Sequence, residues 1–64
     1  MNLSKKKVEI ILADKLIKPT ELSKKANITH VTFNRALNGF KIKPETAGKI
    51  AKALEVPVEQ LLES

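Results

Sequence analysis

The spacing of apolar residues predicts helices along most of the chain. The first segment, Met1 to Ile17, carries an apolar stripe at helical spacing, and Ser4 is placed to cap it. The stripe consists of Val8, Ile11, Leu12 and Leu16, broadened by Ile10 and Ile17. A later segment that begins at Pro44 follows the i, i+3, i+4, i+7 pattern at Ala47, Ile50, Ala51 and Leu54. No stretch shows strand-like alternation, so the sequence predicts an all-α fold and one domain over residues 1–64.

Two short helices joined by a tight turn are predicted between these segments. The first begins at Lys18–Glu21, with proline at its first helical position. The second spans Thr29 to Asn38, and Thr29 can accept a bond from an early backbone N–H. Asn27 tolerates the left-handed backbone that such a corner requires, and Gly39 suits a left-handed exit. Ile28 and Phe33 have the spacing of a hydrophobic staple.

The rest of the chain is predicted to be a loop over Phe40 to Lys43 and a last short helix opened by Pro57. The apolar residues of this end have two interpretations, because they can either seal the core of a small domain or contact a second subunit. They are Val56, Val58, Leu61 and Leu62.

One side of the predicted helix Thr29 to Asn38 has an unusual composition. His30, Val31, Asn34 and Arg35 share that side, while Phe33, Ala36 and Leu37 lie opposite. A merely solvated helix more often carries Glu and Lys. A face of His, Asn and Arg with one short apolar residue suits base edges in a DNA groove.

Each residue of this face has a specific candidate role. Arg35 can donate two parallel hydrogen bonds to a guanine, and Asn34 can bond adenine. His30 can bond a base or a phosphate, and Val31 can contact a thymine methyl. The alternative for Arg35 is a surface arginine paired with a nearby carboxylate, and for Asn34 and Val31 it is an ordinary exposed residue.

Short polar groups near helix ends and the loop lysines are candidate phosphate contacts, which set register without reading sequence. They are Thr20, Thr29, Thr32, Asn38, Lys41 and Lys43. For Thr29 the capping role is the stronger expectation. A solvated charge is the alternative for each lysine.

Charge and composition narrow the function classes. The net charge of +5 and pI near 9.8 favour polyanionic partners. The chain has no cysteine and one histidine, so we expect neither a metal site nor a cofactor. It also lacks an acid–base dyad at helical spacing and a glycine-rich phosphate loop, which argues against an enzyme. No apolar run resembles a membrane span or signal peptide, so we expect a cytoplasmic protein.

These residues together resemble a known class of DNA-binding domain. The segment Leu22 to Gly39 is similar to the helix-turn-helix of bacterial and phage repressors, and the similarity to the phage Cro/repressor (Xre-like) type extends over nearly the whole chain. Pro44-Glu45-Thr46 with Ile50–Leu54 and the final Val56 with Leu61-Leu62 carry that part of the resemblance. It implies a compact five-helix, lambda-repressor-like domain whose second and third helices form the helix-turn-helix.

The reading helix itself is similar to that of the lactose-repressor family. Thr32 to Gly39 reads TFNRALNG here, where that family carries Thr-Val-Ser-Arg-Val-Leu-Asn. The resemblance implies base contacts from His30, Val31 and Arg35, and phosphate contacts from Thr32 and Asn38. A long helix precedes the motif here, however, whereas lactose-type repressors begin at the helix-turn-helix.

The sequence departs from the Cro/repressor pattern at three places. Pro19 stands where many members have a phosphate-touching Gln, so Thr20 must supply any side-chain contact there. Asn27 replaces a preferred Gly. Leu12 and Leu37 stand where many members pair Arg with Glu, and we expect an apolar contact in place of that ion pair.

The function expected from these patterns is sequence-specific binding of double-stranded DNA by a transcriptional regulator, most simply a repressor. A homodimer on a palindromic operator is the expected assembly, with no small-molecule ligand. The alternatives are a protein-interaction module, such as an antitoxin, and a DNA-binding fragment of a larger regulator.

Overall fold

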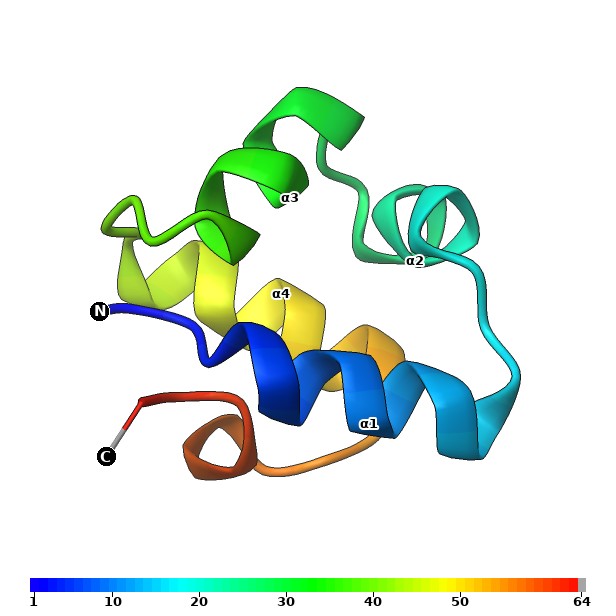
Figure 1. The fold of residues 1–64 in the computed structure, drawn as a ribbon. Coiled ribbons are helices and arrows are strands. Elements are labelled where there is room, and N and C mark those ends of the chain that lie inside the picture. Colours follow the sequence, from blue (N-terminus) through cyan, green and yellow to red (C-terminus); the bar gives the residue numbers. More distant parts are fainter. Residues whose placement is uncertain (64) are drawn as a thin grey trace.

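A computed structural model describes residues 1–63 of the chain and shows an all-α domain (Figure 1). Its elements are α1 Lys5–Lys15, α2 Pro19–Ala26, α3 His30–Leu37, α4 Pro44–Leu54 and a 3-10 turn, η1, at Val58–Gln60. The all-α prediction is therefore confirmed, but the prediction of five helices is wrong. The last apolar segment is a single 3-10 turn, after which Leu62 pairs in a β-bridge with Leu3 and the chain no longer follows a helix.

The core is formed where α2, α3 and α4 meet over α1. Helix α2 packs against both α4 and α3. The predicted stripe of α4 is buried throughout, and the large side chains with under 2% exposure come from every element except η1. These side chains are Phe33, Leu3, Leu22, Ile50, Leu54, Leu61 and Val8.

The first helix begins four residues later than the sequence predicted. Ser4 is its N-cap, with extended backbone (φ −86°, ψ 110°), and its hydroxyl accepts the Lys7 N–H at 3.2 Å. The cap assignment is thus confirmed, while the helical assignment of the first residues is wrong. Leu3 is fully buried instead, which the helical stripe did not anticipate.

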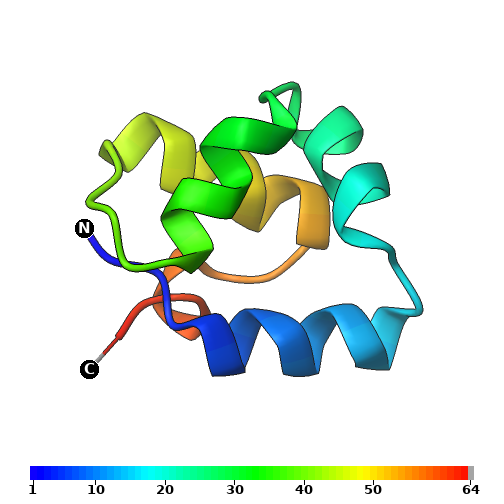
Figure 2. The same cartoon turned by 45° about the horizontal axis from the view of Figure 1, so that its top comes forward.

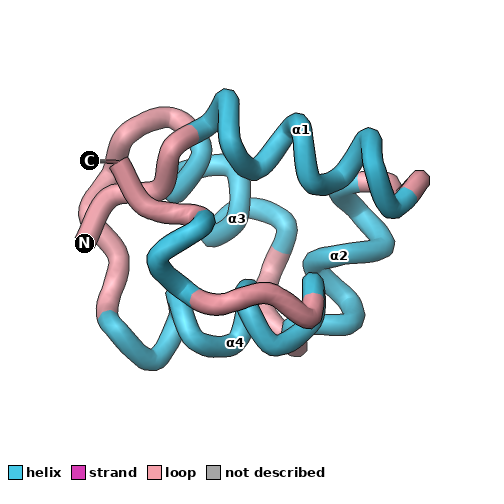
Figure 3. The backbone as a smooth tube through the Cα atoms, turned by 90° about the horizontal axis from the view of Figure 1, so that it is seen from below, coloured by secondary structure: helices cyan, strands magenta, loops and turns pink. Residues whose placement is uncertain are grey.

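The extended N-terminal segment joins two distant parts of the chain. Leu3 forms an antiparallel bridge with Leu62, and the Ser4 N–H donates to the Leu61 carbonyl at 2.7 Å. On its other side, the Ile42 N–H donates to the Met1 carbonyl at 2.8 Å. Figure 3 shows the first residues of the chain beside the C-terminal segment that follows η1. The first residues therefore tie the α3–α4 loop to the C-terminal segment.

All four α-helices end in the same backbone arrangement. A residue with positive φ donates its N–H to the carbonyl three residues earlier, and the next residue donates to the carbonyl five residues earlier, at 3.0–3.4 Å. This is the Schellman motif, which satisfies carbonyls at the helix end. The positive-φ residues are Leu16, Asn27, Gly39 and Glu55. The predictions for Asn27 and Gly39 are confirmed.

The turn between α2 and α3 is built by local hydrogen bonds. Thr29 has extended backbone, and its hydroxyl accepts the Thr32 N–H at 3.1 Å, so the predicted cap is confirmed. Ser23 is buried and donates to the Pro19 carbonyl at 3.0 Å, which leaves its hydroxyl satisfied inside α2. Ile28 and Phe33 both belong to the hydrophobic core, as the staple requires.

The burial of individual side chains bears on two further predictions, one for the apolar residues near the C-terminal end and one for Leu12 and Leu37. Leu61 is fully buried, so it seals the core and cannot also contact a second subunit; Val56, Val58 and Leu62 are half-buried. Leu12 and Leu37 both pack in the core, although Leu37 remains partly exposed. Their direct contact stays a prediction.

The two glycines provide a first test of this backbone. A Cβ on either would meet nothing within 4 Å, but Gly39 has φ +94° and Gly48 lies inside α4. We expect Gly48→Ala to stabilise the fold by about 0.4–1 kcal/mol, because alanine loses less backbone entropy on entering a helix. Gly39→Ala should destabilise it by about 1 kcal/mol, because a Cβ is disfavoured in the left-handed region. Urea denaturation measures both, and equal shifts would contradict the assigned backbone of Gly39.

The cap of α3 provides a second test. Thr29→Ala should cost about 1 kcal/mol, because the Thr32 N–H loses its acceptor. Thr29→Ser retains the hydroxyl and should lower the stability by only a few tenths of a kcal/mol. Thermal melts followed by circular dichroism compare the two variants, and a serine as damaging as alanine would show that the methyl group, not the cap, matters.

Candidate nucleic-acid interface

Helix α3 presents one polar face and buries the opposite one. His30, Asn34 and Arg35 are exposed, and Val31 is 62% exposed. Phe33 and Ala36 on the other side have no exposed surface. In Figure 2 α3 (green) lies at the front of the molecule and crosses in front of α4. The four residues predicted to read bases therefore share one accessible side of a firmly seated helix.

The side chain of Asn38 lies just beyond this face. It is exposed and follows the last residue of α3. Its Nδ2 donates to the Asn34 carbonyl at 2.9 Å. One N–H and the amide oxygen remain for a ligand, so Asn38 is held in place and can still bind.

The threonines at the start of α3 are linked through their hydroxyls. The Thr29 hydroxyl accepts the Thr32 N–H at 3.1 Å, and its Oγ1 lies 2.8 Å from Thr32 Oγ1. Either hydroxyl can supply the single proton of that hydroxyl–hydroxyl bond, so one of the two keeps its own proton for a phosphate. Thr20 is exposed in the first turn of α2, where helix N–H groups favour an anion.

The loop after α3 places two lysines next to the polar face. Lys41 and Lys43 are exposed, and Ile42 between them is half-buried and bonded to Met1. A shallow hollow connects this loop with α3 and the start of α4. It is lined by Thr32, Arg35, Phe40, Lys41, Ile42, Lys43 and Thr46. Three of these residues are cationic, so the hollow extends the α3 face with positive charge.

Phe40 and Thr46 belong to this surface although the sequence did not single them out. Phe40 is 59% exposed, and the Arg35 guanidinium carbon lies over its ring at 5.9 Å from the centroid. The signal that could have identified Phe40 is its position directly after Gly39, where a Schellman motif places a contact with the last turn of the helix. Thr46 lies in the first turn of α4 and carries no motif of its own.

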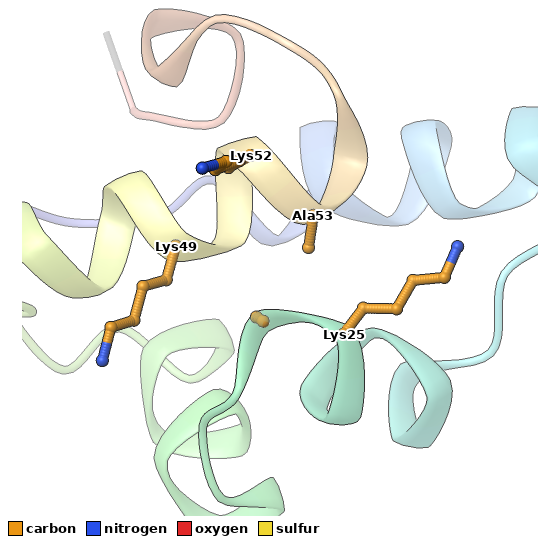
Figure 4. Close-up of a pocket in the computed structure, with 5 residues that line it drawn as sticks. Lys25, Lys49, Lys52 and Ala53 are labelled. Carbon is orange, nitrogen blue, oxygen red and sulfur yellow. The ribbon is translucent and has the colours of Figure 1, made fainter.

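A second basic hollow lies between α2 and α4. Lys25, Lys49 and Lys52 line it over a floor of Ala26 and Ala53. Figure 4 shows the Lys25 and Lys49 side chains extending in opposite directions. Lys49 also reaches Glu45 at 3.5 Å on its own helix. These ammonium groups do not converge on a common point, so the hollow lacks the geometry of an anion pocket.

Within residues 1–63, no three His, Cys, Asp or Glu side chains gather as a metal site would require. No helix in the same part of the chain has both the length and the apolarity needed to cross a bilayer.

Comparison with known proteins agrees with this geometry. The family model of the Cro/C1-type HTH DNA-binding domain matches residues 7–64. The searches of curated proteins and of solved structures gave no match. The matched range takes in all of α2, α3 and α4 and most of α1. The chain therefore belongs to the Cro/C1-type helix-turn-helix family of DNA-binding domains.

Proposed function

We propose that this protein is a sequence-specific regulator of transcription that inserts α3 into the major groove of double-stranded DNA. The observation that carries the proposal is the exposed face of His30, Val31, Asn34 and Arg35 on a helix whose other side buries Phe33 and Ala36 completely. The major groove admits an α-helix and displays a distinct donor and acceptor pattern for each base pair. Family membership makes DNA the partner, and this face supplies the sequence discrimination.

The four side chains have complementary roles in this proposal. Arg35 donates to guanine O6 and N7, and Asn34 pairs with adenine N6 and N7. His30 lies in the first turn of α3, where it reaches a base or the adjacent phosphate. Val31 contributes an apolar contact to a thymine methyl. A good bidentate pair discriminates by roughly 1–3 kcal/mol, so Arg35 and Asn34 carry most of the specificity.

The phosphate contacts come from both sides of the reading helix. Thr20 and Thr32 donate hydroxyl protons, Asn38 donates its remaining amide N–H, and Lys41 and Lys43 supply charge from the loop. Thr29 caps α3, which is its stronger role, and its exposed hydroxyl is a further candidate phosphate contact beside Thr32. These contacts fix the register in which α3 meets the bases.

Repression by a homodimer is the simplest form of this activity. Two domains that read half-sites about 34 Å apart would recognise a palindrome. With Leu61 buried in the core, the candidate dimer contacts are the half-buried Val56, Val58 and Leu62. Selection of bound sequences from a random DNA pool tests the whole proposal, because a palindromic consensus would establish specificity and symmetry together.

Salt dependence tests the phosphate contacts. Each neutralised phosphate contributes a slope of about −0.9 to the logarithm of affinity against the logarithm of salt concentration. The two loop lysines alone predict a slope of about −2 per bound domain, and further contacts make it steeper. Fluorescence anisotropy with random duplex at several salt concentrations measures it. A slope near zero would exclude binding through the phosphate backbone.

A pair of variants separates base reading from backbone binding. Arg35→Ala should relax the preference at one base position, with a loss of roughly 1–3 kcal/mol confined to the preferred base. Lys41→Ala should weaken all sequences alike and reduce the salt slope by about 1. Titration of duplexes that differ at single positions compares the variants. An equal loss on every duplex for Arg35→Ala would remove it from the base-reading set.

A further inference from the structure

The end of α3 differs from the ends of the other helices in one respect. In each Schellman motif the residue after the positive-φ position lies beside the residue five positions earlier, to which its N–H is bonded. In three helices both partners face the core, with Ile17, Ile28 and Val56 packed against it. Their bonding partners Leu12, Ser23 and Ala51 are buried. At α3 the corresponding pair is Phe40 and Arg35, and both are exposed.

The exposure of Phe40 has no explanation in the packing of the fold. The chain has two aromatic residues, and the other, Phe33, is completely buried. Phe40 is 59% exposed and is absent from the hydrophobic side chains that pack on the core. Its neighbours in the hollow beside α3 are mostly polar or cationic. The contacts that this ring can make are therefore with the side chains that line the hollow.

The geometry joins Phe40 to Arg35 twice. The Phe40 N–H donates to the Arg35 carbonyl at 3.1 Å, and the guanidinium carbon stands over the Phe40 ring, 5.9 Å from its centroid. The positive φ of Gly39 turns the chain back so that both contacts form. The backbone of Phe40 is therefore held beside Arg35 by a hydrogen bond that does not involve the Arg35 side chain.

We propose that Phe40 is a positioning residue that orients the guanidinium of Arg35 for base recognition. A guanidinium stacks through its face, while its N–H donors lie in its plane. Arg35 can therefore stay on the ring and still present two parallel donors to a guanine. Because the ring restricts the rotamers of a long side chain before DNA arrives, less conformational entropy is lost on binding. This inference rests on the proposed function and specifies how one of its residues acts.

A double-mutant cycle tests the coupling between the two residues. Phe40→Leu keeps an apolar side chain but removes the ring, and Phe40→Tyr keeps the ring. On the preferred duplex, Phe40→Leu should weaken binding about three- to tenfold, the cost of ordering one long side chain. It should also lower the discrimination at the base pair that Arg35 reads. In the Arg35→Ala background the same substitution should change affinity less than about twofold, and Phe40→Tyr should stay near wild type in both backgrounds.

Equal losses for Phe40→Leu with and without the Arg35 guanidinium would overturn the proposal, because Phe40 would then act on DNA or on the fold by itself. Matching urea midpoints for the Phe40 variants exclude a general loss of stability. The wild type could prefer one sequence while Phe40→Leu leaves both its affinity and its discrimination unchanged. That result would overturn this inference and leave the proposed function intact. No sequence preference in the wild type would overturn both.

A measurement without DNA reports on the pair separately. In proton NMR spectra of the free protein, the side-chain methylenes of Arg35 should show a ring-current shift to higher field. Phe40→Leu should abolish that shift and Phe40→Tyr should preserve it. Identical Arg35 shifts in the wild type and in Phe40→Leu would show that the ring does not hold the guanidinium in solution, which would overturn the positioning role.

Discussion

The burial of Phe33 and Ala36 is the constraint on which the rest of the structure depends. Helix α3 has eight residues, too few to be stable alone in water, so it exists because this side packs into the core. Two fully buried positions one turn apart fix the rotation of the helix about its axis. His30, Asn34 and Arg35 must then face outward. The same packing that stabilises α3 therefore exposes its polar residues, and their chemistry can vary without disturbing the core.

The loop beside α3 is positioned by a different kind of contact. Its backbone is bonded to the first residues of the chain through Met1 and through Asn2, whose Nδ2 donates to the Gly39 carbonyl at 2.9 Å. These residues are in turn bonded to the C-terminal segment. The loop can therefore carry Lys41 and Lys43 as freely solvated charges, because neither side chain has to hold the loop in place. Backbone hydrogen bonds set the position of the charge, and the side chains remain available for phosphates.

The features that could be predicted from the sequence are those fixed by neighbouring residues. The caps at Ser4 and Thr29, the prolines that open α2 and α4, and the left-handed Asn27 depend on a few adjacent positions. The bridge from Leu3 to Leu62 joins opposite ends of the chain, and no periodic pattern within the first segment reveals such a pairing. The role of Leu61 could not be decided from the sequence for a related reason. Apolar spacing indicates that a side chain is buried, but not whether the residues that bury it belong to the same chain or to a second subunit. In the candidate site, the helical period was enough to group the face of His30, Val31, Asn34 and Arg35. The contact between the Thr29 and Thr32 hydroxyls and the place of Phe40 required coordinates.

The four helix ends show how one local motif serves two purposes. At α1, α2 and α4 the residue that follows the left-handed turn adds to the core, which helps a domain this small to bury enough surface. At α3 the same turn occurs at the edge of the exposed face, so the residue it places meets a side chain of that face instead. The backbone hydrogen bonds of the Schellman motif are the same at all these helix ends. The carbonyl groups at the end of α3 are therefore hydrogen-bonded in the same way as those of the other helices. What differs is the partner, which at α3 is the exposed Arg35, the residue proposed to read a base. In the proposed function, the motif that stabilises the end of α3 would thus also arrange the binding surface, because its contact falls outside the core.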